Sequence, residues 1–172
     1  MGQGCLFRFN QSISVGRTIS QVGIKDIYLM HADEVKLTLD AGGNVTAATF
    51  ADGKASYKIE GYKQNIQLTT SVFSTDVSVK LATSIIFKMA SDNTYLMKTM
   101  LSGRYYVLVV RNSGSPILVG AQAPLECSGF DYDSNGGAGF ATVTLSAPEG
   151  SGGNYLSGIT TPAVTSITSK SV

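Results

Sequence analysis

Apolar and polar residues alternate with a period of two along most of this chain, which is the pattern of half-buried β-strands. Residues 77–87 show this alternation most clearly. The face expected to be buried carries, at every second position, Val77, Val79, Leu81, Thr83, Ile85 and Phe87. Residues 66–72 alternate in the same way, and the polar stretch 74–76 separates the two segments. We therefore expect a β-hairpin over residues 66–87.

Further segments have the composition of strands and are separated by turn residues. They are residues 35–39, 45–50, 56–61, 105–111, 117–120, 125–128 and 141–145. Tyr57 and Ile59 are expected on the buried face of their strand. Residues 105–111 form a continuous apolar run, which indicates a central strand covered on both faces. Residues 129–139 are interpreted as a glycine-rich loop.

One stretch departs from this period and predicts a helix over residues 92–102. Tyr95, Leu96, Met97, Met100 and Leu101 recur at helical spacing. Residues 91–93 offer N-cap candidates and Gly103 can end the helix.

The pattern as a whole predicts an all-β fold, namely a single antiparallel sandwich or barrel domain with one short helix. Residues 1–22 would form an N-terminal arm, residues 23–156 the β domain, and residues 157–172 a Ser/Thr-rich C-terminal arm. Half of the residues in 157–172 are serine or threonine and none is aromatic. That composition is typical of an arm that is mobile or ordered only against a neighbouring molecule.

Composition and charge narrow the classes of function. The net charge is +1, with 13 basic and 12 acidic residues, which argues against binding nucleic acid through a basic face. Charged residues make up only 15% of the chain, so the surface is expected to be rich in hydroxyl groups and to lie against other copies. No segment approaches the roughly 20 apolar residues that cross a bilayer, so we expect no membrane partner.

The chain offers few residues for catalysis. His31 is the only histidine, so one chain cannot assemble a histidine-based triad or a multi-histidine metal site. Cys5 and Cys127 lie far apart and lack the spacing of metal ligands. The twelve acidic residues show no spacing that singles out a catalytic pair. We therefore expect no enzymatic activity, no metal and no cofactor.

One loop has a weak resemblance to a calcium site. Asp131, Asp133 and Asn135 occupy the first three ligand positions of an EF-hand loop, and Gly136 occupies its glycine position. Position 12 falls on Thr142 instead of a glutamate, and neither flank has a helical pattern. An ordinary β-loop is therefore the expected structure, with a cation site as the alternative.

The tip of the predicted hairpin is a candidate subunit contact formed by Phe73, Ser74, Thr75 and Asp76. An exposed aromatic side chain at a loop tip suggests a contact with another molecule. The alternative is that Phe73 folds back onto its own core.

Several short stretches, taken in order, carry a resemblance to a known group of proteins. They are residues 23–29, 43–46, 53–58, 101–107 and 109–114, followed by Gly120, Leu125-Glu126, the Gly136 loop and residues 142–146. With these stretches the sequence resembles virion proteins of phages and prophages of Bacteroides-like hosts, which look like tail-tube proteins or close relatives of them. The order and spacing of these stretches carry the resemblance, which spans residues 23–156.

The resemblance implies a structural protein of the phage tail, in a tail tube or in a neck or short-tail ring, that forms a conduit for DNA. Its partners would be further copies of itself in a ring, expected to be a hexamer, stacked rings, and other tail, neck or portal proteins. DNA would pass without specific binding. The protein would assemble in the cytoplasm of the bacterial host and reside in the virion tail. Two alternatives remain: a head-associated or decoration protein of the virion, and a ligand-binding β-domain.

Overall fold

The computed structural model describes residues 23–61, 65–74, 79–89, 99–135, 140–148 and 156–172. For residues 72–74, 79–82 and 89 it describes the backbone alone. The strands are β1 (Ile24–His31), β2 (Val35–Leu39), β3 (Val45–Phe50), β4 (Tyr57–Glu60), β5 (Ile66–Ser74), β6 (Val79–Met89), β7 (Arg104–Arg111), β8 (Ile117–Val119), β9 (Leu125–Tyr132), β10 (Ala141–Ser146) and β11 (Ser157–Gly158). Helix α2 covers Thr161–Ser169. The predicted all-β class is confirmed.

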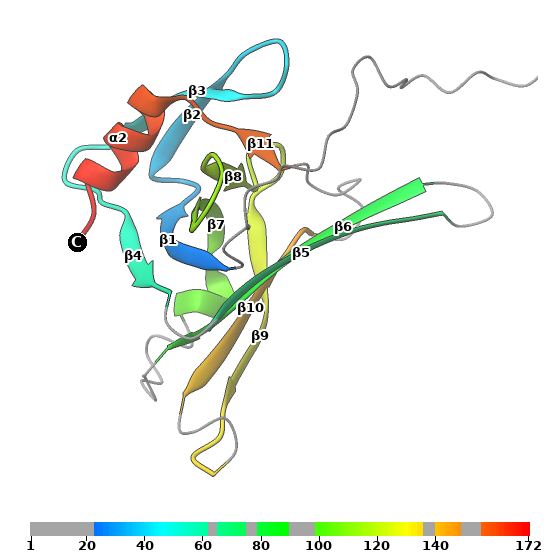
Figure 1. Ribbon diagram of the computed structural model, residues 1–172. Helices are drawn as coiled ribbons and strands as arrows, with labels where there is room; N and C mark the ends of the chain where they lie inside the picture. The colour runs from blue at the N-terminus through cyan, green and yellow to red at the C-terminus, as the bar shows by residue number, and fades with distance from the viewer. Residues whose placement is uncertain (1–22, 62–64, 75–78, 90–98, 136–139, 149–155) are drawn as a thin grey trace, which may run out of the picture.

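Nine of these strands form one antiparallel sheet in the order β11-β8-β7-β9-β10-β6-β5, with β1 paired to β7 and β4 paired to β1. The remaining two, β2 and β3, pair with each other in a separate sheet. The large sheet is strongly curved but does not close on itself (Figure 1). Strand β5 lies at one end of it, and β11 and β4 lie at the others.

The concave side of the large sheet holds the main apolar cluster. This cluster contains Ile27, Leu29, Ile66, Ile85, Phe87, Met100, Tyr105, Val107, Val109, Val119, Leu125, Val143 and Leu145, all of them buried. The predicted alternation is confirmed where side chains are described on β6, because Thr83, Ile85 and Phe87 are buried and Lys88 is exposed. The curled sheet therefore surrounds a core built from its own inward-facing residues.

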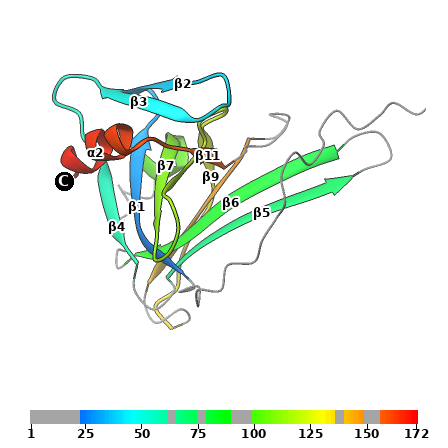
Figure 2. The same cartoon turned by 45° about the horizontal axis from the view of Figure 1, so that its top comes forward.

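A second apolar cluster lies on the opposite face of β1, β7 and β8. Tyr28, Met30, Leu108 and Leu118 project from these strands into it, and the β2–β3 hairpin and α2 cover it. Figure 2 shows α2 and the β2–β3 hairpin side by side on this face of the fold. Strand β7 is thus buried on both faces, as its continuous apolar sequence predicts.

The predicted C-terminal arm is replaced in the structure by an integrated part of the fold. After β11, residues Thr161–Ser169 form α2, which buries Ala163 and Ile167 in the second cluster. The hydroxyl groups that suggested an arm are used within the fold. For example, Ser166 Oγ donates to the carbonyl of Ala48 at 2.8 Å, and Thr165 Oγ1 donates to the carbonyl of Thr161 at 3.0 Å.

Three smaller expectations are also revised or limited. Residues 99–102 are helical, whereas the remainder of the predicted 92–102 helix lies outside the described residues. Tyr57, expected to be buried, is 45% exposed because β4 has a neighbour on one side only. The predicted loop 129–139 begins later than expected, because β9 continues to Tyr132. The N-terminal arm of residues 1–22 lies outside the described part of the chain.

Candidate assembly interface

The hairpin formed by β5 and β6 extends beyond the rest of the described fold. The two strands pair from Ile66 opposite Phe87 to Ser74 opposite Val79. On its other side, β6 pairs with β10 only from Ser84 to Met89. The outer half of the hairpin is therefore a two-stranded ribbon among the described strands, and Figures 1 and 2 both show it projecting away from the body.

Side-chain exposure along β5 shows where the strand leaves the core. Ile66 is 5% exposed and Leu68 is half-buried, as expected for inward-facing positions. From Thr69 to Ser71 every side chain is exposed, whichever face of the strand it occupies. On β6, by contrast, Thr83 opposite Thr70 is buried, so the exposure in this region lies on the β5 side of the hairpin.

One backbone hydrogen bond determines which β5 groups point to the free edge. The amide of Lys88 donates to the carbonyl of Asn65 at 3.0 Å, and the register of the hairpin has no shift. In an antiparallel pair, residues that exchange hydrogen bonds alternate with residues whose backbone groups point away. The backbone N–H and C=O groups of Asn65 therefore point toward β6, and so do those of Gln67, Thr69 and Ser71. The N–H and C=O groups of Ile66, Leu68, Thr70, Val72 and Ser74 point outward.

The free edge of β5 lacks the features that usually prevent edge strands from pairing with other chains. Protective features include charged side chains, proline, bulges and very short strand length. The sequence of β5 is IQLTTSVFS, nine residues without a charge or a proline. By contrast, the edge strand β4 has four residues, two of them charged. Among the described strands, β5 thus has one long edge that no other strand pairs with and that is competent to accept a further strand.

A groove of about 550 Å³, lined mainly by apolar residues but also by Gln67 and Arg111, begins beside the first residues of this edge. It lies where β5 approaches β1, β7 and β8 across the opening of the curled sheet. Its apolar lining includes Ile24, Ile66, Leu68, Ile117 and Leu156, and Gly23 lies on its rim. Ile24, Leu68 and Ile117 also pack against the main core. The groove therefore joins the free edge of β5 to the apolar interior of the sheet.

The sequence-predicted tip contact is only partly placed by the structure. Phe73 and Ser74 are the last residues of β5, and the backbone of Phe73 is opposite that of Lys80. Their side chains, and Thr75 and Asp76 entirely, lie outside the described part of the molecule. The contact through Phe73 stays a prediction.

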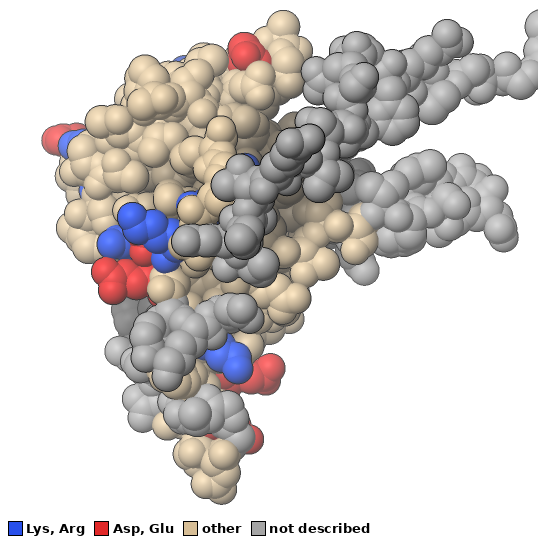
Figure 3. All heavy atoms as spheres, viewed as in Figure 1, with Lys and Arg blue, Asp and Glu red and all other residues tan. Residues whose placement is uncertain are grey.

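Charged groups on the described surface are few, and some of them form ion pairs. Ion pairs join Lys54 to Glu34 at 2.8 Å, Lys58 to Glu60 at 3.2 Å, and Arg104 to Glu126 at 3.2 Å. Their hydrogen bonds to glutamate raise the pKa values of Lys54 and Lys58. Figure 3 shows the view of Figure 1 as largely uncharged, with blue and red atoms in small mixed groups. This face carries no continuous basic patch over the described residues.

The single histidine lines a largely polar hollow of about 760 Å³ at the end of β1, together with Asp33, Glu34 and Arg104. Its ring is 5.9 Å from that of Tyr57 and 5.1 Å from that of Tyr105, centroid to centroid. The Tyr105 hydroxyl donates to the carbonyls of Thr99 and Met100, and burial raises its pKa to about 12. A phenol with that pKa stays protonated near neutral pH and cannot serve as a general base there.

The predicted cation loop is divided between a strand and a turn. Asp131 lies within β9, opposite Thr142 of β10, and Asp133 Oδ1 accepts a hydrogen bond from the amide of Asn135 at 2.9 Å. That bond is an ordinary turn interaction of an aspartate side chain. In the part of the chain that the structure describes, no three His, Cys, Asp or Glu side chains meet in a metal-binding group.

Only one of the two cysteines, Cys127, lies in the described part of the chain. The Cys127 thiol is half-buried and free, it contacts the carbonyl of Gly129 at 3.4 Å, and burial raises its pKa. A raised pKa keeps the thiol protonated and weakly nucleophilic. Cys5 lies outside the described residues.

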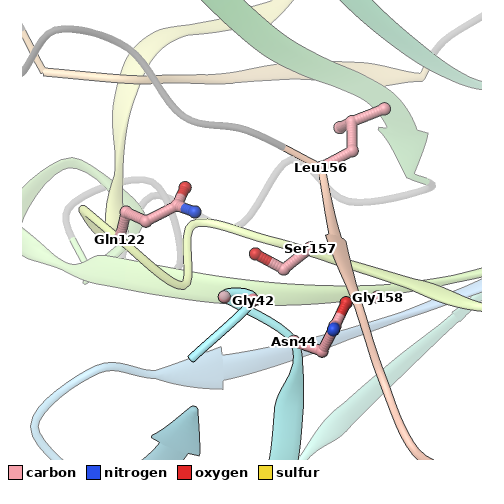
Figure 4. Close-up of a pocket in the computed structure, with 7 residues that line it drawn as sticks. Gly42, Asn44, Gln122, Leu156, Ser157 and Gly158 are labelled. Carbon is pink, nitrogen blue, oxygen red and sulfur yellow. The ribbon is translucent and has the colours of Figure 1, made fainter. Parts of the chain in front are cut away.

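A second pocket, of about 420 Å³, lies between the β2–β3 turn and β11. Figure 4 shows the side chains of Asn44, Gln122 and Ser157 around it. Asn44 is fixed by Asp40, whose pKa is lowered by hydrogen bonds from the backbone and side chain of Asn44. The Ser157 hydroxyl is buried without a hydrogen-bond partner among the described residues. This pocket offers amide and hydroxyl groups to a small neutral ligand.

Comparison with known proteins adds no relative. Scans of protein-family models, curated proteins and solved structures find no match to this chain. Over its described residues, no helix is both long enough and apolar enough to cross a bilayer.

The free edge and the groove are features that the sequence analysis missed. It identified residues 66–72 as a strand but did not place that strand at the end of the sheet. One signal was present, since the nine residues of β5 contain neither a charge nor a proline. That signal alone cannot distinguish an unprotected edge from a strand buried in the middle of a sheet.

Proposed function

We propose that this protein is a self-assembling structural subunit of a phage tail, forming a ring or tube that conducts DNA. The observation that carries the proposal is the β5 edge. It is nine residues long, uncharged, and displayed on a hairpin that projects beyond the body. A soluble protein normally protects such an edge, so an edge left open is suited to pairing with another chain.

The sequence resemblance to tail-tube-like virion proteins supports the same role. Its matching stretches fall on β1, on the turns before β3 and β4, and on β7 and β10. Of these elements, β1, β4, β7 and β10 belong to the curled sheet around the main core, whereas β3 belongs to the separate β2–β3 hairpin. A tail-tube-like fold is part of the proposal, with the curled sheet as the body of each subunit and the hairpin as its connecting element.

Ring formation follows from the geometry of such a joint. One edge that pairs with a different surface of the next copy makes a heterologous interface, and heterologous interfaces close into rings or continue as tubes. A ring, expected to be a hexamer, and stacks of such rings would use one kind of contact many times. Tail, neck or portal proteins would be the partners at the ends.

Charge is compatible with a conduit for DNA. A wall rich in lysine or arginine would retain phosphates by releasing counterions, which would hinder passage. Three of the described basic side chains, Lys54, Lys58 and Arg104, are paired with glutamate, and the net charge of the chain is +1. We therefore propose a lumen lined by neutral and acidic side chains.

Two alternatives can be separated from this proposal. A head-associated or decoration protein would also assemble but would be found on capsids. A ligand-binding β-domain is favoured by one observation, the unpartnered Ser157 hydroxyl in the pocket beside Asn44. Such a domain would stay monomeric.

The decisive experiment compares assembly of the wild-type protein with two substitutions at one edge position. Thr70→Pro removes an N–H that points to the free edge and leaves the hydrogen bonds between β5 and β6 intact. Thr70→Ala is the matched control, because it also removes the hydroxyl that lies 3.3 Å from Thr83 Oγ1 but keeps the N–H.

We expect rings or tubes by negative-stain microscopy for the wild type and Thr70→Ala, and folded monomers for Thr70→Pro. Circular dichroism would confirm that all three proteins are folded. A wild-type protein that remains monomeric at every concentration would overturn the proposal and favour the ligand-binding alternative.

A further inference from the structure

Residues 5–15, which precede the described part of the chain, have the alternation of a β-strand. One face would carry Cys5, Phe7, Phe9, Ile13 and Val15, interrupted only by Gln11. The other face would carry Leu6 and then the polar residues Arg8, Asn10, Ser12 and Ser14. The segment contains no proline, and its eleven positions match the nine residues of β5 in length. Its pattern therefore predicts a strand with one apolar face.

The structure offers this segment an acceptor of matching chemistry. The outward N–H and C=O groups of β5 belong to Ile66, Leu68, Thr70, Val72 and Ser74, as the Lys88–Asn65 hydrogen bond determines. Among the described strands, β5 pairs with β6 alone. A strand added at this edge would continue the apolar face on which Ile66 and Leu68 lie, and that face leads into the groove.

The segment is tethered beside this edge by the course of the chain. Gly23, with a φ of 120°, lies on the rim of the groove together with Ile24 and Ile66. Seven residues, 16–22, separate Gly23 from Val15. An extended link of that length spans about 25 Å. Either the β5 edge of the same copy or that of an adjacent copy is therefore within reach.

Burial favours the adjacent copy. From Thr69 to Ser71 the side chains of β5 are exposed, and a strand added outside β5 would lie farther still from β6 and from the body. If the same chain supplied that strand, the apolar face containing Phe7 and Phe9 would stay in water. Large apolar side chains stabilise a contact only when the contact removes them from water. A neighbouring subunit that lies against the projecting hairpin provides the missing cover, and its own N-terminal segment can supply the added strand.

We infer that residues 5–15 of one copy pair as a strand with the β5 edge of a neighbouring copy, placing Phe7 and Phe9 between the two subunits. This inference rests on the proposed self-assembly and names the element that makes the joint. Backbone hydrogen bonds supply the attachment and the alternating apolar side chains supply the register, as in other cases of strand addition. Each copy gives one strand and receives one.

The first test is a photo-cross-link made between labelled and unlabelled copies. Phe9→p-benzoylphenylalanine places the probe on the apolar face, and Tyr132→p-benzoylphenylalanine is the control at an exposed position on β9. Assembled particles would be prepared from an equal mixture of ¹⁴N and ¹⁵N protein, irradiated and digested. Mass spectrometry should find position 9 joined to residues 66–74 of a copy carrying the other label, with no such product from position 132.

Cross-links from position 9 to β5 that never join the two labels would show pairing within one copy and would overturn the inference. Cross-links from position 9 to other parts of the assembled particle, or a lack of any, would overturn it as well.

A pair of substitutions separates this inference from the proposed function. Phe9→Asp places a charge on the apolar face, and Asn10→Asp places the same charge on the opposite face as a matched control. We expect Phe9→Asp to lower the assembled fraction by about tenfold or more and Asn10→Asp to leave it nearly unchanged. If Thr70→Pro abolishes assembly and Phe9→Asp does not, the role of the β5 edge stands and the N-terminal strand is excluded as its partner. If the wild type does not assemble, both proposals fail.

Discussion

The buried ring of Tyr105 occupies the space that a side chain on Gly103 would need. A Cβ atom built on Gly103 would overlap the hydroxyl and the outer ring atoms of Tyr105. Tyr105 is 2% exposed, and its hydroxyl donates to the carbonyls of Thr99 and Met100 in the helical turn that ends just before Gly103. The glycine therefore allows the chain to leave this turn and enter β7 with the tyrosine folded back beneath it.

Gly103→Ala is expected to destabilise the protein by about 1–3 kcal/mol, because the added Cβ would force the buried tyrosine ring to shift. Gly129→Ala is the matched control, since a Cβ atom there meets Thr144 at an ordinary contact distance of 3.8 Å. Urea denaturation followed by circular dichroism measures both. Equal losses of stability for the two variants would show that the overlap with Tyr105 is not the cause.

The raised pKa of Tyr105 predicts a loss of stability in alkali. The folded state holds the proton to about pH 12, whereas an unfolded tyrosine releases it near pH 10. The contribution is therefore complete below pH 10 and is lost as the pH rises from 10 to 12, by about 3 kcal/mol at most. Tyr105→Phe should flatten this part of the profile of unfolding free energy against pH. An unchanged alkaline slope in the variant would contradict the assignment.

The C-terminal helix is expected to be part of the cooperative fold. Ile167 is fully buried between α2 and the sheets, so Ile167→Ala should cost about 2–5 kcal/mol. Thr165→Ala, on the exposed side of the same helix, should change stability by less than about 1 kcal/mol. Thermal unfolding of the two variants makes the comparison. Similar midpoints for both would mean that α2 contributes nothing to the folded core.

A conduit for DNA should not bind DNA. Non-specific DNA binders still have dissociation constants of about 10⁻⁴–10⁻⁶ M at physiological salt. We expect the purified protein to bind duplex DNA more weakly than this, with a dissociation constant above about 10⁻⁴ M at roughly 150 mM salt. Fluorescence anisotropy with a labelled duplex measures this affinity. Salt-sensitive binding in the micromolar range would point to a protein that packages or coats DNA.

Much of the strand pattern was predictable because burial on a strand is a local property. The alternation at Thr83, Ile85 and Phe87 and the two-sided burial of residues 105–111 follow from the order of side chains alone. Tyr57 shows the limit of that reasoning. Its strand alternates correctly, but an edge position leaves the side chain half open to solvent.

The sequence did not predict the C-terminal helix, because the high serine and threonine content of residues 157–172 was given more weight than the spacing of their apolar residues. Ala163 and Ile167 are four residues apart, and Pro162 follows Thr160 and Thr161, which together are signals of a short helix start and a buried stripe. The high content of serine and threonine suggested an arm instead. In the structure these hydroxyl groups bond to nearby carbonyls, so they do not prevent the helix.

The candidate interface depended on information that no local pattern contains. The order of strands in the sheet brings β5 to its end and places Gly23, Ile66 and Leu156 around one groove, although these residues are far apart in the sequence. A nine-residue uncharged strand has the same sequence pattern whether it is central or at an edge.

Strand β7 is shared by both apolar clusters, so neither cluster can open without exposing the other. Its backbone amides should therefore exchange with deuterium only through global unfolding, whereas amides beyond Thr69 on the β5–β6 hairpin should exchange through local opening. The molecule thus divides into a stiff hub around β7 and a compliant β5–β6 hairpin. In the proposed assembly, differences in curvature between neighbouring positions would be absorbed by bending of the hairpin, and every hub would keep the same shape.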